Sequence, residues 1–211
     1  RQDNPLREAL TAGAAHQLAR ITALGNDYRP IGKVVDERSI INACVALLSS
    51  GGSTNHSMHI VAIARAAGIL LDWSDLAALS SVVPLMAKVY PNGQADVNHF
   101  HAAGGTSCLF RALLAGGYMH PDAGTIWGDA FSAFINEPFL DNGRLDWRQS
   151  PEKSLDESVL ATIQKPFASE GGLRLLKGNL GRCVLKVSAV AAQHRVVEAC
   201  LLYTSPSPRD A

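Results

Sequence analysis

The chain has 211 residues, of which 47% are hydrophobic and 18% are charged, a composition typical of a globular protein and not of a disordered one. Its 19 basic and 19 acidic side chains balance, and no basic stripe indicates nucleic-acid binding. No apolar run reaches the roughly 18–20 residues that a membrane-spanning helix needs. We therefore expect neither a nucleic-acid partner nor a membrane partner.

Helical patterns dominate the first 170 residues. They predict helices over residues 5–24, 39–48, 53–68, 75–81, 105–114 and 127–135. In the first of these, the apolar face is expected to consist of Leu6, Leu10, Ala14, Leu18 and Ile21; in the third, it is expected to consist of Met58, Val61 and Ala64. Ser39 and Ser53 or Thr54 are expected as amino-terminal caps. A short extended stretch is predicted at 31–35, with turns at 25–27, 136–138 and 141–143.

The pattern changes after Gly171. Residues 173–176, 184–190 and 195–198 have the composition of strands and are separated by glycine turns or polar breaks. This change predicts a domain boundary near residues 166–172. The last residues, 200–211, fit neither pattern, because Pro206 and Pro208 would interrupt a strand. That tail is similar to translated sequencing-adapter read-through, and we expect it to be aberrant.

Four cysteines occur at long and uneven separations, without a Cys-x-x-Cys pair. A disulfide scaffold is not expected in so large and apolar a chain. The pattern instead predicts buried, reduced thiols in a cytoplasmic protein. The four residues are Cys44, Cys108, Cys183 and Cys200.

The strongest local motif is a double glycine followed by short polar residues at the start of a helix. Two glycines permit a sharp turn with uncovered amides, and a helix directs its free N–H groups and positive dipole end toward that turn. A carboxylate or a phosphate would suit such a place. The alternative is an ordinary glycine turn with a serine cap. The candidate substrate-binding residues are Gly52, Ser53, Thr54, Asn55 and His56.

Histidines offer a weak case for a metal. His56 and His59 are three apart on one helix, and His99 and His101 follow Asp96. Zinc requires three or four ligands, and one carboxylate beside a histidine pair does not provide them. We therefore expect no metal ligand in this chain, and capping or substrate-facing roles for the histidines.

Lys177 and Arg182 flank a glycine-containing turn between two predicted strands, where they could contact an anionic substrate. A solvated turn is the alternative. The chain contains no pattern of a nucleophile with its base, so no catalytic residue is expected in it.

Several motifs in order resemble one family. These are Gly51-Gly52-Ser53-Thr54-Asn55-His56, Val83-Pro84-Leu85-Met86-Ala87, Tyr90-Pro91-Asn92-Gly93, Asp96-Val97-Asn98-His99-Phe100 and Ala102-Ala103-Gly104-Gly105. Together they resemble the iron–sulfur dihydroxy-acid and sugar-acid dehydratases. The stretches 137–148, 152–156 and 178–182 are most similar to the branch that dehydrates 6-phospho-D-gluconate in the Entner–Doudoroff pathway.

The resemblance implies an α/β fold, with residues 1–170 as the helix-rich later part of an amino-terminal domain. Residues 171–199 would then begin a carboxy-terminal β-barrel domain. It also implies a 4Fe-4S cluster, often accompanied by a divalent cation, whose ligands lie outside this chain. The full-length protein would act as a homodimer on a phosphorylated sugar acid, and the chain alone would be inactive. Thr106-Ser107-Cys108 departs from the family's usual sequence after the double glycine.

Two alternatives remain open from the sequence. A sibling enzyme of the same family could act on dihydroxy acids or unphosphorylated aldonates. A non-catalytic, anion-binding helical module is the second alternative. Cluster cysteines encoded upstream would distinguish an enzyme from such a module.

Overall fold

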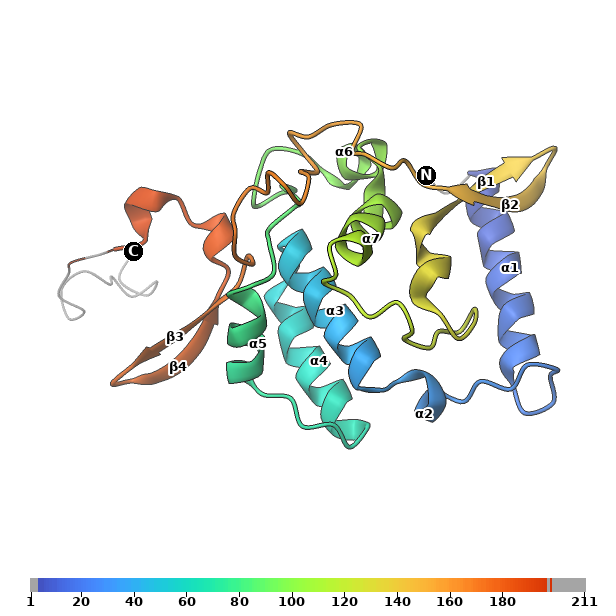
Figure 1. Cartoon of the computed structure of the whole chain (residues 1–211), viewed down its shortest axis with the longest axis horizontal. Helices are drawn as coiled ribbons and strands as arrows, with labels where there is room; N and C mark the ends of the chain where they lie inside the picture. Colours follow the sequence, from blue (N-terminus) through green and yellow to red (C-terminus); the bar gives the residue numbers. More distant parts are fainter. Residues whose placement is uncertain (1–3, 197, 199–211) are drawn as a thin grey trace, which may run out of the picture.

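A computed structural model describes residues 4–196 and 198 (Figure 1). Its α-helices are α1 (Pro5–Ile21), α2 (Ile31–Val34), α3 (Glu37–Ser50), α4 (Thr54–Ala66), α5 (Trp73–Ser80), α6 (Val97–Ala102) and α7 (Gly105–Ala115). The strands form two antiparallel hairpins, β1 (Asn136–Asp141) with β2 (Arg144–Gln149) and β3 (Arg174–Gly178) with β4 (Gly181–Leu185). The 3-10 helices are η1 (Phe131–Ile135), η2 (Val187–Ala189) and η3 (Ala192–His194). Helices followed by a few antiparallel strands confirm the α/β class, and a barrel remains a prediction.

Helix α3 is the centre of the molecule (Figure 1). Leu47 and Leu48 lie in the larger hydrophobic core, which also includes Leu113 of α7 and Leu160. Ile40 and Cys44, on the same helix, belong to a second core with residues of α4 and α5. Because α3 is buried on both sides, it fixes the relative positions of the other helices and of the segments that follow them.

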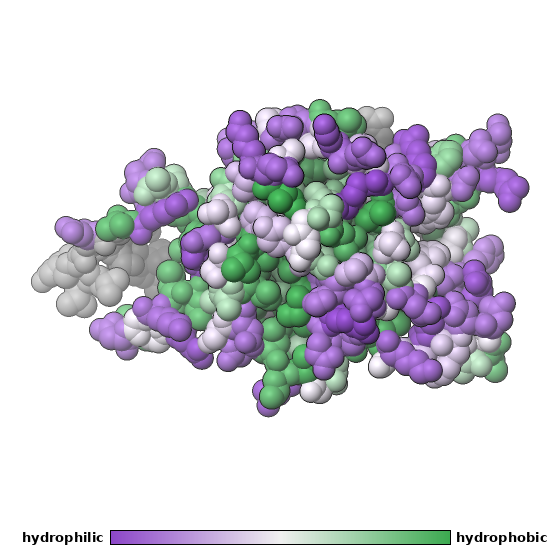
Figure 2. Space-filling view, viewed as in Figure 1, coloured by the Kyte–Doolittle hydropathy of each residue, from purple (hydrophilic) through white to green (hydrophobic). Residues whose placement is uncertain are grey.

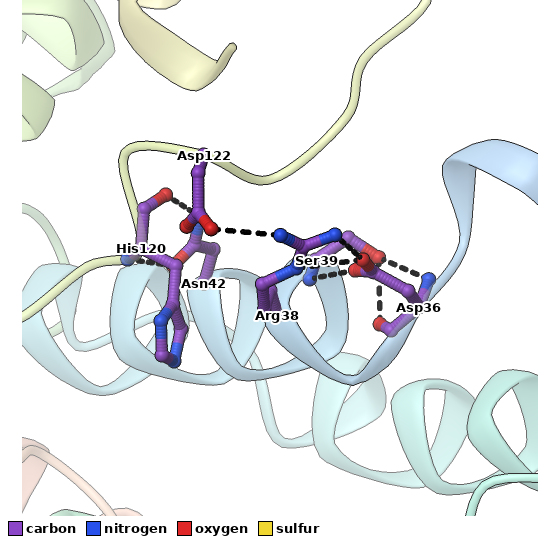
Figure 3. Close-up of polar contacts among 6 residues, drawn as sticks. All are labelled: Asp36, Arg38, Ser39, Asn42, His120 and Asp122. Atoms are coloured by element: carbon purple, nitrogen blue, oxygen red, sulfur yellow. Dashed lines mark hydrogen bonds and ion pairs between the residues drawn. The ribbon is translucent and has the colours of Figure 1, made fainter. Parts of the chain in front are cut away.

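The amino-terminal half of α3 is bonded to a loop 78 residues away in sequence (Figure 3). The cap is Asp36 and not Ser39: the Asp36 side chain accepts the Ser39 amide at 2.8 Å, while Ser39 Oγ receives the Asp36 amide at 2.9 Å. Asn42, only 2% exposed, donates to the His120 carbonyl at 2.9 Å and accepts the His120 amide at 2.8 Å. These bonds fix the loop to the helix.

The predicted apolar face of α1 is partly wrong. Leu18 is 62% exposed, whereas Gln17 is buried and donates to the Ile126 carbonyl at 2.5 Å. From Leu6 to Leu18 the predicted face advances by four residues at each step, which drifts by about 40° per step around a helix. The face that packs includes Gly13 and Gln17, and it lies against the β1–β2 hairpin, where Gly13 faces Leu145.

The packed face of α4 agrees with the prediction at Ala64 but not at Met58. Ser57, Ile60 and Ala64 are buried, whereas Met58 is 55% exposed. The predicted helix itself is confirmed, with Ser53 as its cap.

Several local predictions are wrong. Residues 31–34 form a helical turn and not an extended stretch, and η1 replaces the helix expected over 127–135. Residues 136–138 belong to β1, where Pro138 is tolerated because β1 has a single neighbouring strand. The turn at 141–143 is confirmed: Asn142 and Gly143 both have positive φ, as the turn of a tight hairpin requires.

The carboxy-terminal strands are shorter than expected. β3 agrees with the prediction, but β4 ends at Leu185 and η2 follows it. Arg195, Val196 and Glu198 are not in a strand, and residue 197 lies outside the described residues, as does the tail at 200–211.

The thiols differ in exposure. Cys44 and Cys108 are buried as predicted, but Cys183 is exposed, because it lies on the outer hairpin β3–β4. Cys200 lies outside the described residues. All three described thiols are free.

Polar residues cover both ends of the face in Figure 2, whereas apolar residues reach the surface over its middle, where α3, α4 and α5 lie. Even so, none of the described helices is both long enough and apolar enough to cross a bilayer.

Candidate functional site

The double glycine ends α3. Gly51 has a left-handed conformation, with φ of 59°, and caps the helix. Its amide and that of Gly52 donate back to carbonyls of the last turn, Gly52 to Leu47 at 2.9 Å. The expectation of uncovered amides at these two glycines is therefore wrong, because the turn uses them to satisfy the end of the helix.

Free amides do occur one step later, at the start of α4. Ser53 Oγ accepts the Asn55 amide at 3.1 Å, and the His56 amide donates to the Ser53 carbonyl at 3.0 Å. Among the described residues, no acceptor lies at the amides of Ser53 and Thr54. These two amides, and the positive end of the α4 dipole, are the part of the motif that can still bind an anion.

A cavity of about 350 Å³ opens beside this helix start. Thr54, Ser57 and Met58 of α4 form one wall, and Trp73 of α5 forms another. The wall opposite α4 is the β3–β4 hairpin, which contributes Leu175, Arg182, Cys183 and Val184. The structure thus brings Thr54 and Arg182, which are 128 residues apart in sequence, into one cavity.

Arg182 is the cation of this cavity. One guanidinium nitrogen lies 3.4 Å from Ser74 Oγ, at the start of α5. Lys177 is paired with Arg182 across the hairpin, so both side chains lie on the same face. Lys177 is exposed and does not line the cavity. Of the two basic candidates, Arg182 therefore lines the cavity and Lys177 does not.

His56 is half-buried next to the turn. Burial lowers its pKa, and the neighbouring His59 lowers it further, so its imidazole is neutral at pH 7. A neutral ring can both accept and donate a hydrogen bond. His56 does not line the 350 Å³ cavity, so its place as a candidate ligand of an anion remains a prediction.

The second histidine motif has a structural role. Asp96 caps α6, and its carboxylate lies 2.8 Å from Nδ1 of His99. Hydrogen bonds from the backbone and side chain of His99 lower the Asp96 pKa to about 2. Over residues 4–196 and 198, no three His, Cys, Asp or Glu side chains come together as a metal site.

The described cysteines do not fit an iron–sulfur cluster. Cys44 is fully buried in the core, and burial raises its pKa to about 11. Burial also raises the pKa of Cys108. Cluster ligands are thiolates, so these protonated core thiols are unsuitable, and Cys183 is alone on the hairpin. We derive no step of a reaction through a cluster in this chain.

Comparison with known proteins decides the family. Residues 2–134 match the family model described as the amino-terminal part of dihydroxy-acid/6-phosphogluconate dehydratases. The chain belongs to this dehydratase family. The match includes the turn, the helix start and the Asp96 motif. The β3–β4 hairpin with Arg182 lies beyond it, but is covered by the individual relatives.

The alignments with individual relatives cover most of this chain. It is 56% identical to a phosphogluconate dehydratase of Pseudomonas aeruginosa over 93% of its length, covering 32% of that protein. It is 55% identical to a phosphogluconate dehydratase of Escherichia coli, again over 93% of this chain and 33% of the relative. A dihydroxy-acid dehydratase of Albidiferax ferrireducens is 31% identical over 89% of the chain and 31% of the relative. The chain thus spans about a third of the length of these relatives.

Sequence reasoning missed part of the cavity. It did not anticipate Trp73 or Ser57 as lining residues, because both fit an ordinary helix pattern. It also gave no reason to place Arg182 beside Thr54. A signal existed only in the alternation of β3 and β4, which puts Leu175, Arg182 and Val184 on one face.

Proposed function

We propose that the protein containing this chain dehydrates 6-phospho-D-gluconate to 2-dehydro-3-deoxy-6-phospho-D-gluconate, a step of the Entner–Doudoroff pathway. The proposal rests on the sequence identity of this chain to two kinds of dehydratase. Relatives named phosphogluconate dehydratase reach 56% identity, against 31% for the relative named dihydroxy-acid dehydratase. Family membership also argues against a module unrelated to dehydratases.

The chain would contribute a wall of the substrate pocket. Thr54 and Arg182 line the 350 Å³ cavity from opposite sides, and the free amides of Ser53 and Thr54 lie at the start of α4 beside it. An arginine and two helix-terminal amides are suitable for holding a carboxylate, since both supply donors with positive charge. Asn55 and His56 follow on the same helix turn and complete the donor set. In this proposal these residues bind and orient the acid, and the groups that break its bonds lie elsewhere in the longer protein.

Assembly and location follow from the same proposal. The longer protein would be a cytoplasmic homodimer, with a 4Fe-4S cluster and a divalent cation held by residues outside this chain. The strands after residue 171 would begin its carboxy-terminal barrel domain. Residues 1–211 alone would then show no dehydratase activity.

The test is product formation by the full-length enzyme, assayed with Arg182→Ala and Asn55→Ala variants. We expect the KM for 6-phosphogluconate to rise about tenfold in Arg182→Ala, since a hydrogen bond to a charged group contributes about 1.5–3 kcal/mol. A smaller rise is expected for Asn55→Ala, which removes a neutral amide. Arg144→Ala removes an exposed arginine from the β1–β2 hairpin and serves as the control.

No 2-dehydro-3-deoxy-6-phosphogluconate from the wild-type enzyme would contradict the function. Normal kinetics in both Arg182→Ala and Asn55→Ala would instead contradict the site and leave the reaction in place.

A further inference from the structure

A second cavity, of about 400 Å³, has a basic lining. It lies between the segment 85–92, the segment 167–174 and the 3-10 helices after β4. Lys88, Arg174 and Arg195 line it, with Glu170 as its one carboxylate. The whole chain has a formal charge of zero, so three cations around one cavity are a local concentration of charge. We call this cavity the basic hollow.

Its charge is largely uncompensated. Glu170 forms an ion pair with Arg174. In the described part of the chain, no carboxylate forms an ion pair with Lys88 or with Arg195. The hollow therefore carries about two positive charges. A ligand with two negative charges would neutralise them, whereas a single carboxylate would not.

The side chains of Lys88 and Arg195 are both held in place by neighbouring groups. The Lys88 ammonium lies 5.3 Å from the centre of the Phe167 ring, and the Lys88 amide donates to the Val159 carbonyl at 2.9 Å. Arg195 donates from Nε to the Val190 carbonyl at 3.2 Å and from Nη2 to the Val187 carbonyl at 3.4 Å. These bonds orient the guanidinium and leave Nη1 for a ligand.

The hollow is joined to the turn of the proposed substrate pocket. Asn92 lines the hollow, and its side chain donates to the Gly51 carbonyl at 2.9 Å. Ser188, another lining residue, donates to Asn92 Oδ1 at 2.8 Å. Gly172 packs against Gly51, since a Cβ on Gly172 would lie 3.0 Å from the Gly51 Cα. These contacts connect the lining of the hollow to the turn before α4, so they would fix the position of a group bound in the hollow relative to a group bound at α4.

We infer that the basic hollow binds a phosphate monoester group, with Lys88 and Arg195 neutralising its two charges. A phosphate offers three acceptor oxygens, and the ammonium and guanidinium donors meet them with charge-assisted hydrogen bonds. The assignment of this group to the substrate's own phosphate rests on the proposed function. The inference that the hollow binds phosphate does not depend on the proposed function.

The test uses the full-length enzyme with Lys88→Gln, Arg195→Gln and the double variant. Two quantities are measured: the KM for 6-phosphogluconate, and the Kd for inorganic phosphate by titration calorimetry. We expect both to rise about tenfold in each single variant and about a hundredfold or more in the double variant, with kcat changed less than about twofold. Lys88→Arg should restore most of the affinity, because it keeps the charge.

The matched control is Lys33→Gln. Lys33 also lies over an aromatic ring, 5.9 Å from the centre of Tyr28, but it belongs to α2 and does not line the hollow. Its removal should leave both constants unchanged. The melting temperature of each variant is measured as well. If Lys33→Gln lowers the melting temperature as much as the double variant does but leaves KM and Kd unchanged, the loss of affinity in the double variant is not an effect of stability.

Three outcomes separate the possibilities. Unchanged phosphate affinity in the double variant, or no phosphate binding by the wild type, would overturn the inference. Weakened phosphate binding with an unchanged KM would contradict the assignment to the substrate and support a site for free phosphate. If the enzyme does not turn over 6-phosphogluconate at all, the phosphate titration still tests the hollow.

Discussion

Asn42 shows how a single polar residue stabilises the centre of the molecule. Its side chain satisfies both the amide and the carbonyl of His120 from within the core (Figure 3). Asn42→Ala would leave two backbone groups without partners, and an unsatisfied buried group costs about 1–3 kcal/mol. We expect the free energy of unfolding to fall by about 2–4 kcal/mol, measured by urea denaturation.

Arg38→Ala is the control for that loss. Arg38 connects Asp36 and Asp122 to the same helix, but it is 46% exposed, so its ion pairs are screened by water. The loss there should be below about 1 kcal/mol. Equal losses in the two variants would contradict the role given to Asn42.

Burial also separates the thiols by reactivity. Burial raises the Cys44 pKa to about 11, and the charge of Asp75 adds to this effect, whereas Cys183 is exposed. Only the thiolate reacts with iodoacetamide. At pH 8 we expect Cys183 to be labelled in the folded protein and Cys44 to be protected, as read by peptide mass spectrometry. Rapid labelling of Cys44 without denaturant would contradict its place in the core.

The same shift has a consequence for stability. A thiol whose pKa is raised on folding stabilises the folded state at pH values below its unfolded pKa of about 9. That contribution is lost as the pH rises toward about 11. Folding should therefore weaken over this alkaline range, and Cys44→Ala should weaken less steeply there.

At the level of elements, the β3–β4 hairpin depends on a close approach between glycines. Gly172 has Ser188 Oγ 2.7 Å and the Gly51 Cα 3.0 Å from the position of a Cβ, whereas the space around Gly178 is open. Gly172→Ala should therefore push the hairpin base away from the end of α3, at a cost of about 1–3 kcal/mol. Gly178→Ala, in the same hairpin, should have little effect on the urea midpoint. Similar midpoints for the two variants would contradict the close packing.

The elements also show what the sequence can and cannot predict. The existence of α1, α3, α4, α5 and α7 follows from their periodicity, and the Asn142-Gly143 turn follows from its chemistry. Which side of α1 packs did not follow, because Gly13 and Gln17 lie on the buried face without being apolar. The composition of residues 136–138 predicts a turn, since proline is uncommon in strands. Their place in β1 depends on pairing with β2, where Pro138 lies opposite Trp147.

The candidate site divides in the same way. The turn at Gly51 and Gly52 was recognised from its residues, but the use of its amides depends on how α3 ends. Arg182 lines one cavity with Thr54, and Lys88 lines another with Arg195, in each case across more than 100 residues of sequence. No local pattern contains them, because they depend on how the hairpin and the 3-10 helices pack against the helical core.

For the molecule as a whole, we propose two binding surfaces in this chain and assign no reacting group to it. One cavity contains Arg182 and the other contains Lys88 and Arg195, and Asn92 of the second cavity bonds to the Gly51 carbonyl of the turn before α4. This arrangement suits a substrate with an acid at one end and a phosphate at the other. It also explains why a dihydroxy acid, which has no phosphate, would leave the basic hollow without a ligand.

We propose that the full-length protein selects a phosphorylated sugar acid over other acids. The most direct measurement compares kcat/KM of the full-length enzyme for 6-phosphogluconate, gluconate and 2,3-dihydroxyisovalerate under one set of conditions. We expect 6-phosphogluconate to be preferred over gluconate by at least about a hundredfold, as the loss of two charge-assisted contacts implies. Equal values for the phosphorylated and unphosphorylated sugar acids, or a preference for the dihydroxy acid, would contradict the account.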